Sequence, residues 1–103
     1  MWAQLITART RPDADAELSR LHKMIRAAEE PGSGLLRTII ARDQNDPAQL
    51  YTLVVFDSEE HARARERDPR RQQQLEPARA LMAELFDGPP QFVDLTVVDE
   101  WTG

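Results

Sequence analysis

The sequence predicts one α+β domain whose elements follow the order β-α-β-β-α-β. Three observations predict it. The chain has 103 residues, 41% of them hydrophobic and 30% charged, which suits a single globular domain over residues 1–103. Short runs rich in β-branched and aromatic residues alternate with segments whose hydrophobic residues recur every three or four positions. Proline, glycine and aspartate separate these segments, as they do at turns and helix ends.

The first half of the chain predicts three strands and one helix. Residues 2–9 form the first strand, and Asp13 begins a helix that ends before Pro31. Residues 35–41 and 50–56 form two further strands, joined by a loop rich in turn-forming residues at 42–47. The hydrophobic residues of the helix fall on one face and are expected in the core: Leu18, Leu21, Ile25 and Ala28.

The second half predicts an interrupted helix and a last strand. Asp57 is the expected N-cap, with Glu60 returning a hydrogen bond as in a capping box. Asp68-Pro69 divides the helix into pieces near 58–67 and 70–86, because proline lacks an amide donor. The longer piece has one hydrophobic face, which carries Leu75, Ala78, Met82 and Leu85. The last strand covers residues 92–98.

This order of elements is that of the ferredoxin-like split βαβ fold, a four-stranded antiparallel sheet with the helices on one face. The second face of the sheet also needs a cover, because residues 35–41 and 50–56 are hydrophobic on both sides. No element of the chain remains for this task. We therefore predict a homodimer that packs through the open sheet face.

Composition and charge exclude several classes of function. Thirteen Lys and Arg against 18 Asp and Glu give a net charge of −5, the wrong sign for binding nucleic acid. Without cysteine the chain has no disulfide, thiolate nucleophile or cysteine-held metal, and it fits a reducing cytoplasm. No hydrophobic stretch predicts a membrane partner. The spacing of the two histidines and the four glycines predicts no metal and no nucleotide cofactor.

Several features resemble the antibiotic biosynthesis monooxygenase family of dimeric α+β barrels. They are the order of elements, the pattern Phe56-x-Ser58-x-Glu60, Asp68-Pro69 within the second helix, and Gly88-Pro89-Pro90 before the last strand. The resemblance implies a pocket between sheet and helices. Members of the family include cofactor-free oxygenases of anthrone-type polyketide intermediates, haem-degrading enzymes, quinol oxygenases and small isomerases.

Two branches of this family can be compared with the chain residue by residue. The haem-degrading branch has Asn, Trp and an axial His where this chain has Thr7, Arg65 and Gln74, so haem degradation is not expected. The anthrone-oxidising branch has Trp where this chain has Phe56, which keeps an aromatic face but lacks the indole N–H. That branch also has an aromatic residue near the position of His61.

The expected site is a pocket for a small aromatic or phenolic ligand, with no cofactor. His22 and His61 are the candidate bases, because histidine titrates nearest neutrality. Arg65 or Thr7 would hold the developing oxyanion. The residues expected to line the pocket are Thr7, His22, Thr38, Phe56, His61 and Arg65. The histidines and Arg65 also have plain structural interpretations. His22 would be a histidine at the flank of its helix and His61 a surface histidine, and Arg65 would belong to a solvated, salt-bridged basic helix face around residues 63–71.

Three functional hypotheses follow. The first is a cofactor-independent monooxygenase that oxidises a polyketide-like aromatic substrate. The second is a non-catalytic module for small-molecule binding or dimerisation. The third is a cofactor-free cyclase or isomerase on the same scaffold. Oxygen uptake distinguishes the first from the third, and a ligand that is bound but unchanged indicates the second.

Overall fold

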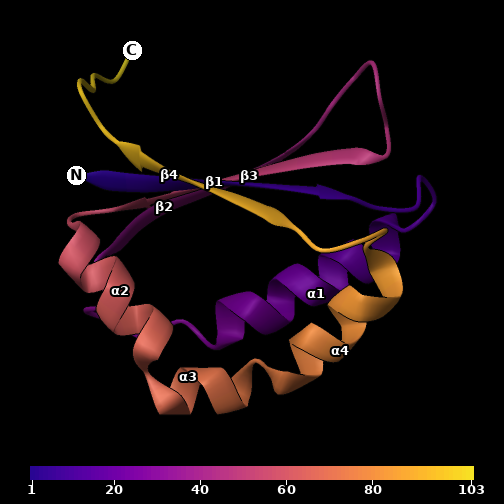
Figure 1. Cartoon of the computed structure of the whole chain (residues 1–103), viewed down its shortest axis with the longest axis horizontal. Helices are drawn as coiled ribbons and strands as arrows, with labels where there is room; N and C mark the ends of the chain where they lie inside the picture. The colour runs from indigo at the N-terminus through magenta and orange to yellow at the C-terminus, as the bar shows by residue number, and fades with distance from the viewer.

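The computed structural model describes residues 1–103, and its elements follow the predicted order. They are β1 (Trp2–Arg9), α1 (Asp15–Ala27), β2 (Leu35–Arg42), β3 (Gln49–Phe56), α2 (Glu59–Arg67), α3 (Pro69–Gln74), α4 (Glu76–Leu85) and β4 (Gln91–Thr96). The strands form one antiparallel sheet in the order β2-β3-β1-β4. Figure 1 shows all the helices on the same side of this sheet. The predicted α+β, ferredoxin-like fold class is confirmed.

The strand register determines which side chains face the helices. Successive residues of a strand face opposite sides, and β1 pairs with β3 without interruption from Trp2↔Phe56 to Arg9↔Gln49. Trp2 and Phe56 pack against α2, so they mark the helical side of the sheet. Between β2 and β3 the register shifts once, between Leu35 and Arg37. This bulge turns Leu35 toward the helical side, where it packs against the same cluster.

The N-cap of α2 is Ser58, so the prediction of Asp57 in this role was wrong. Ser58 has extended backbone angles, and its hydroxyl accepts a hydrogen bond from the His61 N–H at 3.2 Å. The carboxylate of Asp57 instead lies 2.6 Å from Nδ1 of His61. Both residue types cap helices well, and here the side-chain contact with His61 occupies the aspartate.

Two other helix boundaries differ from the prediction. The first helix begins at Asp15, because a turn closed by the Ala14 N–H and the Arg11 carbonyl at 3.3 Å precedes it. The long final piece is two helices, α3 and α4, which meet at Leu75. Pro77 lies in the first turn of α4 and has no N–H to donate to the end of α3, which explains the break.

The hydrophobic core lies between sheet and helices in two clusters. The larger cluster joins α1, α4 and the start of β3, and its members are Ala14, Leu18, Leu21, Ala28, Leu50, Leu75, Ala78, Leu81 and Leu85. Ile25 and Met82 pack against it and are partly buried. The smaller cluster joins Trp2, Val54 and Phe56 to Ala62 of α2. The predicted hydrophobic faces of both helical segments therefore do face the sheet.

The opposite face of the sheet carries no covering element in this chain (Figure 1). Hydrophobic side chains remain exposed on it, with 46% of Ile39, 37% of Tyr51 and 48% of Val93 accessible to solvent. Beyond β4, Val98 and Trp101 are also exposed. No helix of the chain has the length and hydrophobicity needed to cross a membrane.

Candidate functional site

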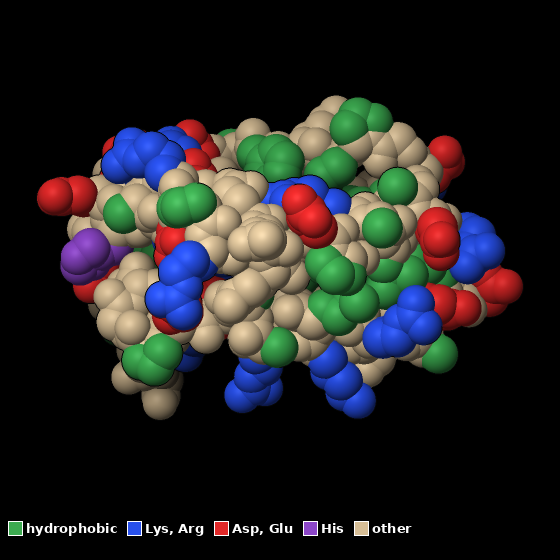
Figure 2. All heavy atoms as spheres, turned by 90° about the horizontal axis from the view of Figure 1, so that it is seen from below, with side chains coloured by type: hydrophobic (Ala, Val, Ile, Leu, Met, Phe, Trp, Pro, Cys, Tyr) green, Lys and Arg blue, Asp and Glu red, His purple; other side chains and the backbone are tan.

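Two recesses lie on the helical side of the molecule. The larger, which we call the α1–β2 cleft, has a volume of about 420 Å³ and runs between α1 and the β2–β3 hairpin. The smaller, which we call the α2 recess, has a volume of about 210 Å³ and lies between α2 and the loop that follows α1. Figure 2 views the helical face, where acidic and basic side chains are interspersed.

One face of α1 forms the first wall of the α1–β2 cleft. Its lining residues recur every three or four positions, so they share a side of the helix next to the hydrophobic stripe: Asp15, Leu18, Ser19, His22 and Arg26, with Lys23 beside them. The other wall is made by Ile40, Ala41 and Arg42 of β2 and by Leu50 of β3. The cleft therefore combines a hydrophobic part with a basic part.

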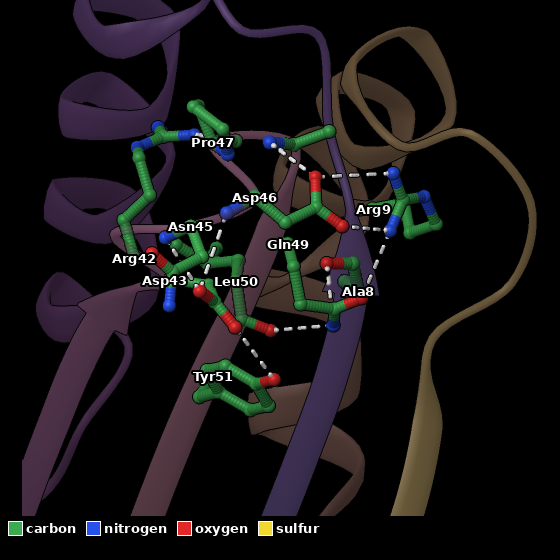
Figure 3. Close-up of polar contacts among 11 residues, drawn as sticks. Ala8, Arg9, Arg42, Asp43, Asn45, Asp46, Pro47, Gln49, Leu50 and Tyr51 are labelled. Atoms are coloured by element: carbon green, nitrogen blue, oxygen red, sulfur yellow. Dashed lines mark hydrogen bonds and ion pairs between the residues drawn. The ribbon is translucent and has the colours of Figure 1, made fainter.

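Arg42 joins the two walls of the cleft. Its Nη2 donates to Oδ1 of Asp15 at 2.7 Å, and its Nη1 donates to the carbonyl oxygen of Pro47 in the hairpin loop. Figure 3 shows this guanidinium beside Pro47 in the loop. Both donor nitrogens are engaged within the protein, so Arg42 stabilises the walls rather than presenting a free charge.

The hairpin loop that holds Arg42 has its own polar support (Figure 3). Asp46 pairs with Arg9 at 2.9 Å, and this contact lowers the pKa of Asp46. Asp43 accepts from the Asn45 N–H at 2.8 Å and from the Tyr51 hydroxyl at 3.2 Å, which raises the pKa of Tyr51. These bonds join both ends of the loop to the sheet and so define the β2 wall.

His22 is half-buried in the cleft, and burial lowers its pKa below the ordinary value of 6.5. Desolvation disfavours the charged imidazolium and so favours the neutral ring, the form that can accept a proton. Its side chain makes no hydrogen bond to the protein. His22 is therefore the histidine whose surroundings suit a general base on a bound ligand.

The α2 recess contains an ion pair between Arg65 and Glu29. Nε of Arg65 lies 2.9 and 3.0 Å from the two carboxylate oxygens, and Ser33 donates to the same carboxylate at 2.7 Å. Only 14% of the Arg65 side chain and 18% of the Glu29 side chain are exposed. Burial raises the pKa of Glu29, but the hydrogen bonds from Arg65 and Ser33 outweigh it and lower the pKa overall.

Arg65 also packs its guanidinium over the ring of Phe56, with Cζ 5.2 Å from the ring centroid. A side chain bound on one side by Glu29 and on the other by an aromatic ring is not free to hold a ligand. Arg65 therefore fastens the loop that follows α1 to α2, and the oxyanion-holding role expected for it loses support.

His61 stands at the rim of the α2 recess and forms a close pair with Asp57. The contact with His61 lowers the pKa of Asp57. Gly34 packs directly against this pair: an added Cβ would lie 2.5 Å from Oδ1 of Asp57 and 2.7 Å from Cβ of His61. Gly34 also has φ +88°, so both the lack of space for a Cβ and the backbone conformation require glycine here.

The six residues expected to form one pocket do not meet in one place, and this part of the prediction is corrected. His22 lines the α1–β2 cleft, whereas His61 and Arg65 line the α2 recess. Phe56 is 3% exposed and belongs to the core. Thr38 pairs with Val54 and shares its helical side, but it lines neither recess.

Thr7 lies on the open face of the sheet, opposite to the helices. It pairs with Tyr51, and both residues alternate with side chains that face the core. A hydrogen bond from Thr7 to a ligand on the helical side is therefore not possible in this register. The same alternation was present in the sequence, because Trp2 and Thr7 stand an odd number of residues apart on one strand.

The prediction names His22 and Arg65 but not their neighbours Glu29, Asp15 and Arg26. Glu29 and Arg65 lie far apart in sequence, and no local pattern joins them. Asp15, His22 and Arg26 repeat with helical spacing, and this periodicity is a signal that could have identified the cleft wall. The structure places no group of three or more His, Asp or Glu side chains where they could hold a metal ion.

Comparisons with known proteins address the fold. No family model matches the sequence, and no curated protein matches it. Among solved structures, one named "Putative antibiotic biosynthesis monooxygenase from Nitrosomonas europaea" aligns with TM-score 0.71 at 17% identity, over 96% of this chain and all of that one. Similarly named proteins align at 22% identity (Chloroflexus aurantiacus, TM-score 0.66, covering 99% and 98%) and 19% identity (Caulobacter crescentus, TM-score 0.73, covering 95% and 90%).

These alignments span nearly the whole of both chains, so the likeness extends to every element described above. Identities of this size establish a shared fold and leave the chemistry to the residues of the site. The chain has the α+β ferredoxin-like fold of solved proteins that carry the name antibiotic biosynthesis monooxygenase.

Proposed function

We propose that this protein is a homodimeric, cofactor-independent monooxygenase that oxidises a small aromatic or phenolic substrate in the α1–β2 cleft. The observation that carries the proposal is the position of His22, a half-buried imidazole in a cleft with hydrophobic walls and basic edges, where burial favours the neutral ring. The fold shared with proteins named as monooxygenases supports it.

The reaction proposed needs a base and a substrate that is itself reactive toward dioxygen. His22 takes a proton from an activated methylene or phenol, and the resulting carbanion transfers electrons to dioxygen. One oxygen atom remains on the carbon as a carbonyl, and the other leaves as water with the two hydrogens of the methylene. The positive charges of Lys23 and Arg26 favour the anion that forms on deprotonation.

The homodimer in this proposal buries the open face of the sheet. Ile39, Tyr51 and Val93 form part of a hydrophobic surface that no element of the chain covers. A second copy offers the same surface, and packing the two sheets face to face removes both from water. The α1–β2 cleft lies on the other side of the sheet and stays open in such a dimer.

Oxygen consumption with a dihydroxyanthrone such as dithranol tests the proposed reaction. We expect enzyme-dependent uptake of one dioxygen per substrate above the spontaneous rate, and a loss of about a hundredfold in kcat for His22→Gln, the scale of general-base catalysis. The same substitution at His61 tests the other histidine: a loss there, with His22→Gln fully active, would place the base in the α2 recess.

A second candidate function is ligand binding without chemistry, and one observation favours it. His22 has no hydrogen-bond partner to orient its ring, whereas catalytic imidazoles are commonly oriented by a carboxylate or carbonyl. A ligand that binds in the cleft and is recovered unchanged, with no oxygen consumed, supports this alternative. Conversion of the ligand without oxygen uptake supports a cyclase or isomerase instead.

A further inference from the structure

The α1–β2 cleft is positively charged although the whole molecule is acidic. Its lining carries three permanently basic side chains, Lys23, Arg26 and Arg42, and one carboxylate, Asp15. The chain as a whole carries a net charge of −5. A basic cleft on an acidic protein concentrates anions locally while the rest of the surface repels them.

Two of these three cations have no partner in the protein. Asp15 is already paired with Arg42, whose second nitrogen is bound to the Pro47 carbonyl. Lys23 and Arg26 form no ion pair within 4 Å. They stand three positions apart on α1, so both side chains lie on neighbouring positions of the same helix face. This arrangement leaves two charges free to hold one anionic group.

The hydrophobic part of the cleft lies beside this pair of cations. The side chains of Leu18, Ile40 and Leu50 form it, and 38% of the Ile40 surface is exposed to solvent. At about 420 Å³ the cleft falls at the small end of the size range of ligand pockets. A molecule of two or three rings with one anionic end matches both parts of the lining.

The α2 recess offers no comparable site for an anion. Arg65 is occupied by Glu29, and Glu30 and Asp68 also line the recess. Arg71 is the one cation of this lining that forms no ion pair, and it shares the recess with these three carboxylates. An anion there would meet these carboxylates at close range, whereas in the α1–β2 cleft the single carboxylate is neutralised by Arg42. The α1–β2 cleft thus holds two unpaired cations, Lys23 and Arg26, beside one carboxylate that is already paired, whereas the α2 recess holds one unpaired cation among three carboxylates.

We propose that the α1–β2 cleft binds an aromatic carboxylate, with the rings against Ile40 and Leu18 and the carboxylate between Lys23 and Arg26. This deepens the proposed function by naming the ligand class, and it rests on that function for the choice of cleft but not for the reaction. The carboxylate takes charge-assisted hydrogen bonds from both cations. The rings displace water from the hydrophobic wall.

Calorimetric titration with 2-naphthoate and its neutral analogue 2-naphthamide tests the ligand class. The two molecules have nearly the same shape and differ in charge. We expect naphthoate to bind at least about tenfold more tightly than naphthamide at low salt, and this preference to shrink as salt is added. Equal affinities for the two molecules, or no binding of naphthoate, would overturn the proposal.

A pair of double variants locates the site. Lys23→Gln/Arg26→Gln should weaken naphthoate binding by about tenfold or more and leave naphthamide nearly unaffected. Arg11→Gln/Arg20→Gln removes the same charge from exposed positions outside the cleft and should change little. If both double variants weaken binding equally, a general effect of net charge explains the result and the site is wrong.

Binding and turnover separate this inference from the proposed function. Naphthoate binding that depends on Lys23 and Arg26, without oxygen uptake by any aromatic substrate, would support the ligand class and contradict the oxygenase. Oxygen uptake with a neutral anthrone, without any preference for anionic ligands, would support the oxygenase and contradict the ligand class. A thermal unfolding curve for each variant shows whether the fold has been kept.

Discussion

Glu29 and Arg65 form the most enclosed ion pair of the molecule, and Arg65 also covers the ring of Phe56. A partly buried charge is costly when its partner is removed, because the remaining group has lost its water without compensation. The pair joins α2 to the loop that follows α1. Its strength should therefore be visible in the stability of the whole fold.

We expect Arg65→Ala to lower the free energy of unfolding by about 2 kcal/mol, since Glu29 is left partly buried with Ser33 as its only hydrogen-bond partner. Arg70→Ala is the matched control: Arg70 is 75% exposed and stands 3.8 Å from Glu30, and its loss should cost less than about 0.5 kcal/mol. Urea unfolding at pH 7 measures both. Equal effects of the two variants would contradict the structural role given to Arg65.

The same pair sets a pH dependence whose sign follows from the pKa of Glu29. Because the folded state lowers that pKa below 4.5, the unfolded state binds the proton more readily. The stabilisation is present above pH 4.5 and is lost as the pH falls through the lowered value. In Arg65→Ala this acid-side loss of stability should be smaller than in the wild type.

At the scale of elements, the loop between α1 and β2 is docked against α2 through Gly34. The Gly34 carbonyl accepts a hydrogen bond from the Asp57 N–H at 2.9 Å, which continues the β2–β3 pairing beyond the ends of the two strands. The side chains of Asp57 and His61 leave no room for a Cβ at residue 34, so glycine permits α2 to start directly beside the strand. The position of His61 depends on this close approach.

Gly34→Ala should therefore destabilise the protein more than Gly32→Ala. Both glycines have positive φ, +88° and +81°, so each alanine costs about 1 kcal/mol in backbone strain. Only at residue 34 does the new Cβ also collide, and overpacking adds roughly 1–3 kcal/mol. Denaturant unfolding of the two variants compares them directly. A larger effect at residue 32 would show that the close contact with Asp57 and His61 yields without cost.

Local pattern predicted the elements better than their contacts. The spacing of Leu18 and Leu21 identifies the buried face of α1 because a helix face is a local property. The choice of Ser58 over Asp57 as N-cap depends on a competing contact with His61, which local rules do not contain. The predicted break at Asp68-Pro69 is present, whereas the second break, at Leu75, follows from Pro77 and is absent from the prediction.

The candidate site was predicted less well for a related reason. Residue type makes His22 and His61 candidate bases, and the structure places His22 in a cleft. However, the partners that decide what a side chain can do come from other elements. Arg42 and Asp15 are brought together by the hairpin, and Glu29 meets Arg65 only when α2 packs on the loop. Such pairings are tertiary, and one sequence does not contain a signal for them.

At the scale of the whole molecule, the two faces of the sheet differ in what they contact. The helical side contains the core and both recesses, and the other side exposes hydrophobic residues. A chain of 103 residues buries a modest share of its surface, so covering this face in the proposed dimer would add a considerable fraction of its stability. In such a dimer, assembly and folding would be coupled.

The proposed dimer is tested by two substitutions at neighbouring positions of β2. Ile39→Glu puts a charge on the open face and should convert a dimer into a monomer, because an unpaired carboxylate cannot be buried in the interface. Ile40→Glu puts the same charge on the helical side and should leave the dimer intact. Sedimentation equilibrium measures both. A monomeric wild-type protein would contradict the dimer outright.

Strand β2 therefore contributes side chains to both the α1–β2 cleft and the open face of the sheet. Thr38, Ile40 and Arg42 face the helical side, and Arg37, Ile39 and Ala41 face the open side. Tolerance to mutation along this strand should alternate with a period of two residues. In a saturation scan, substitutions at Ile39 should lower stability more when the protein is diluted, because they weaken the proposed dimer. Substitutions at Ile40 and Arg42 should lower stability less when a ligand of the cleft is present. Alternate residues of one strand would thus be constrained for different reasons, one set by ligand binding and the other by dimer formation.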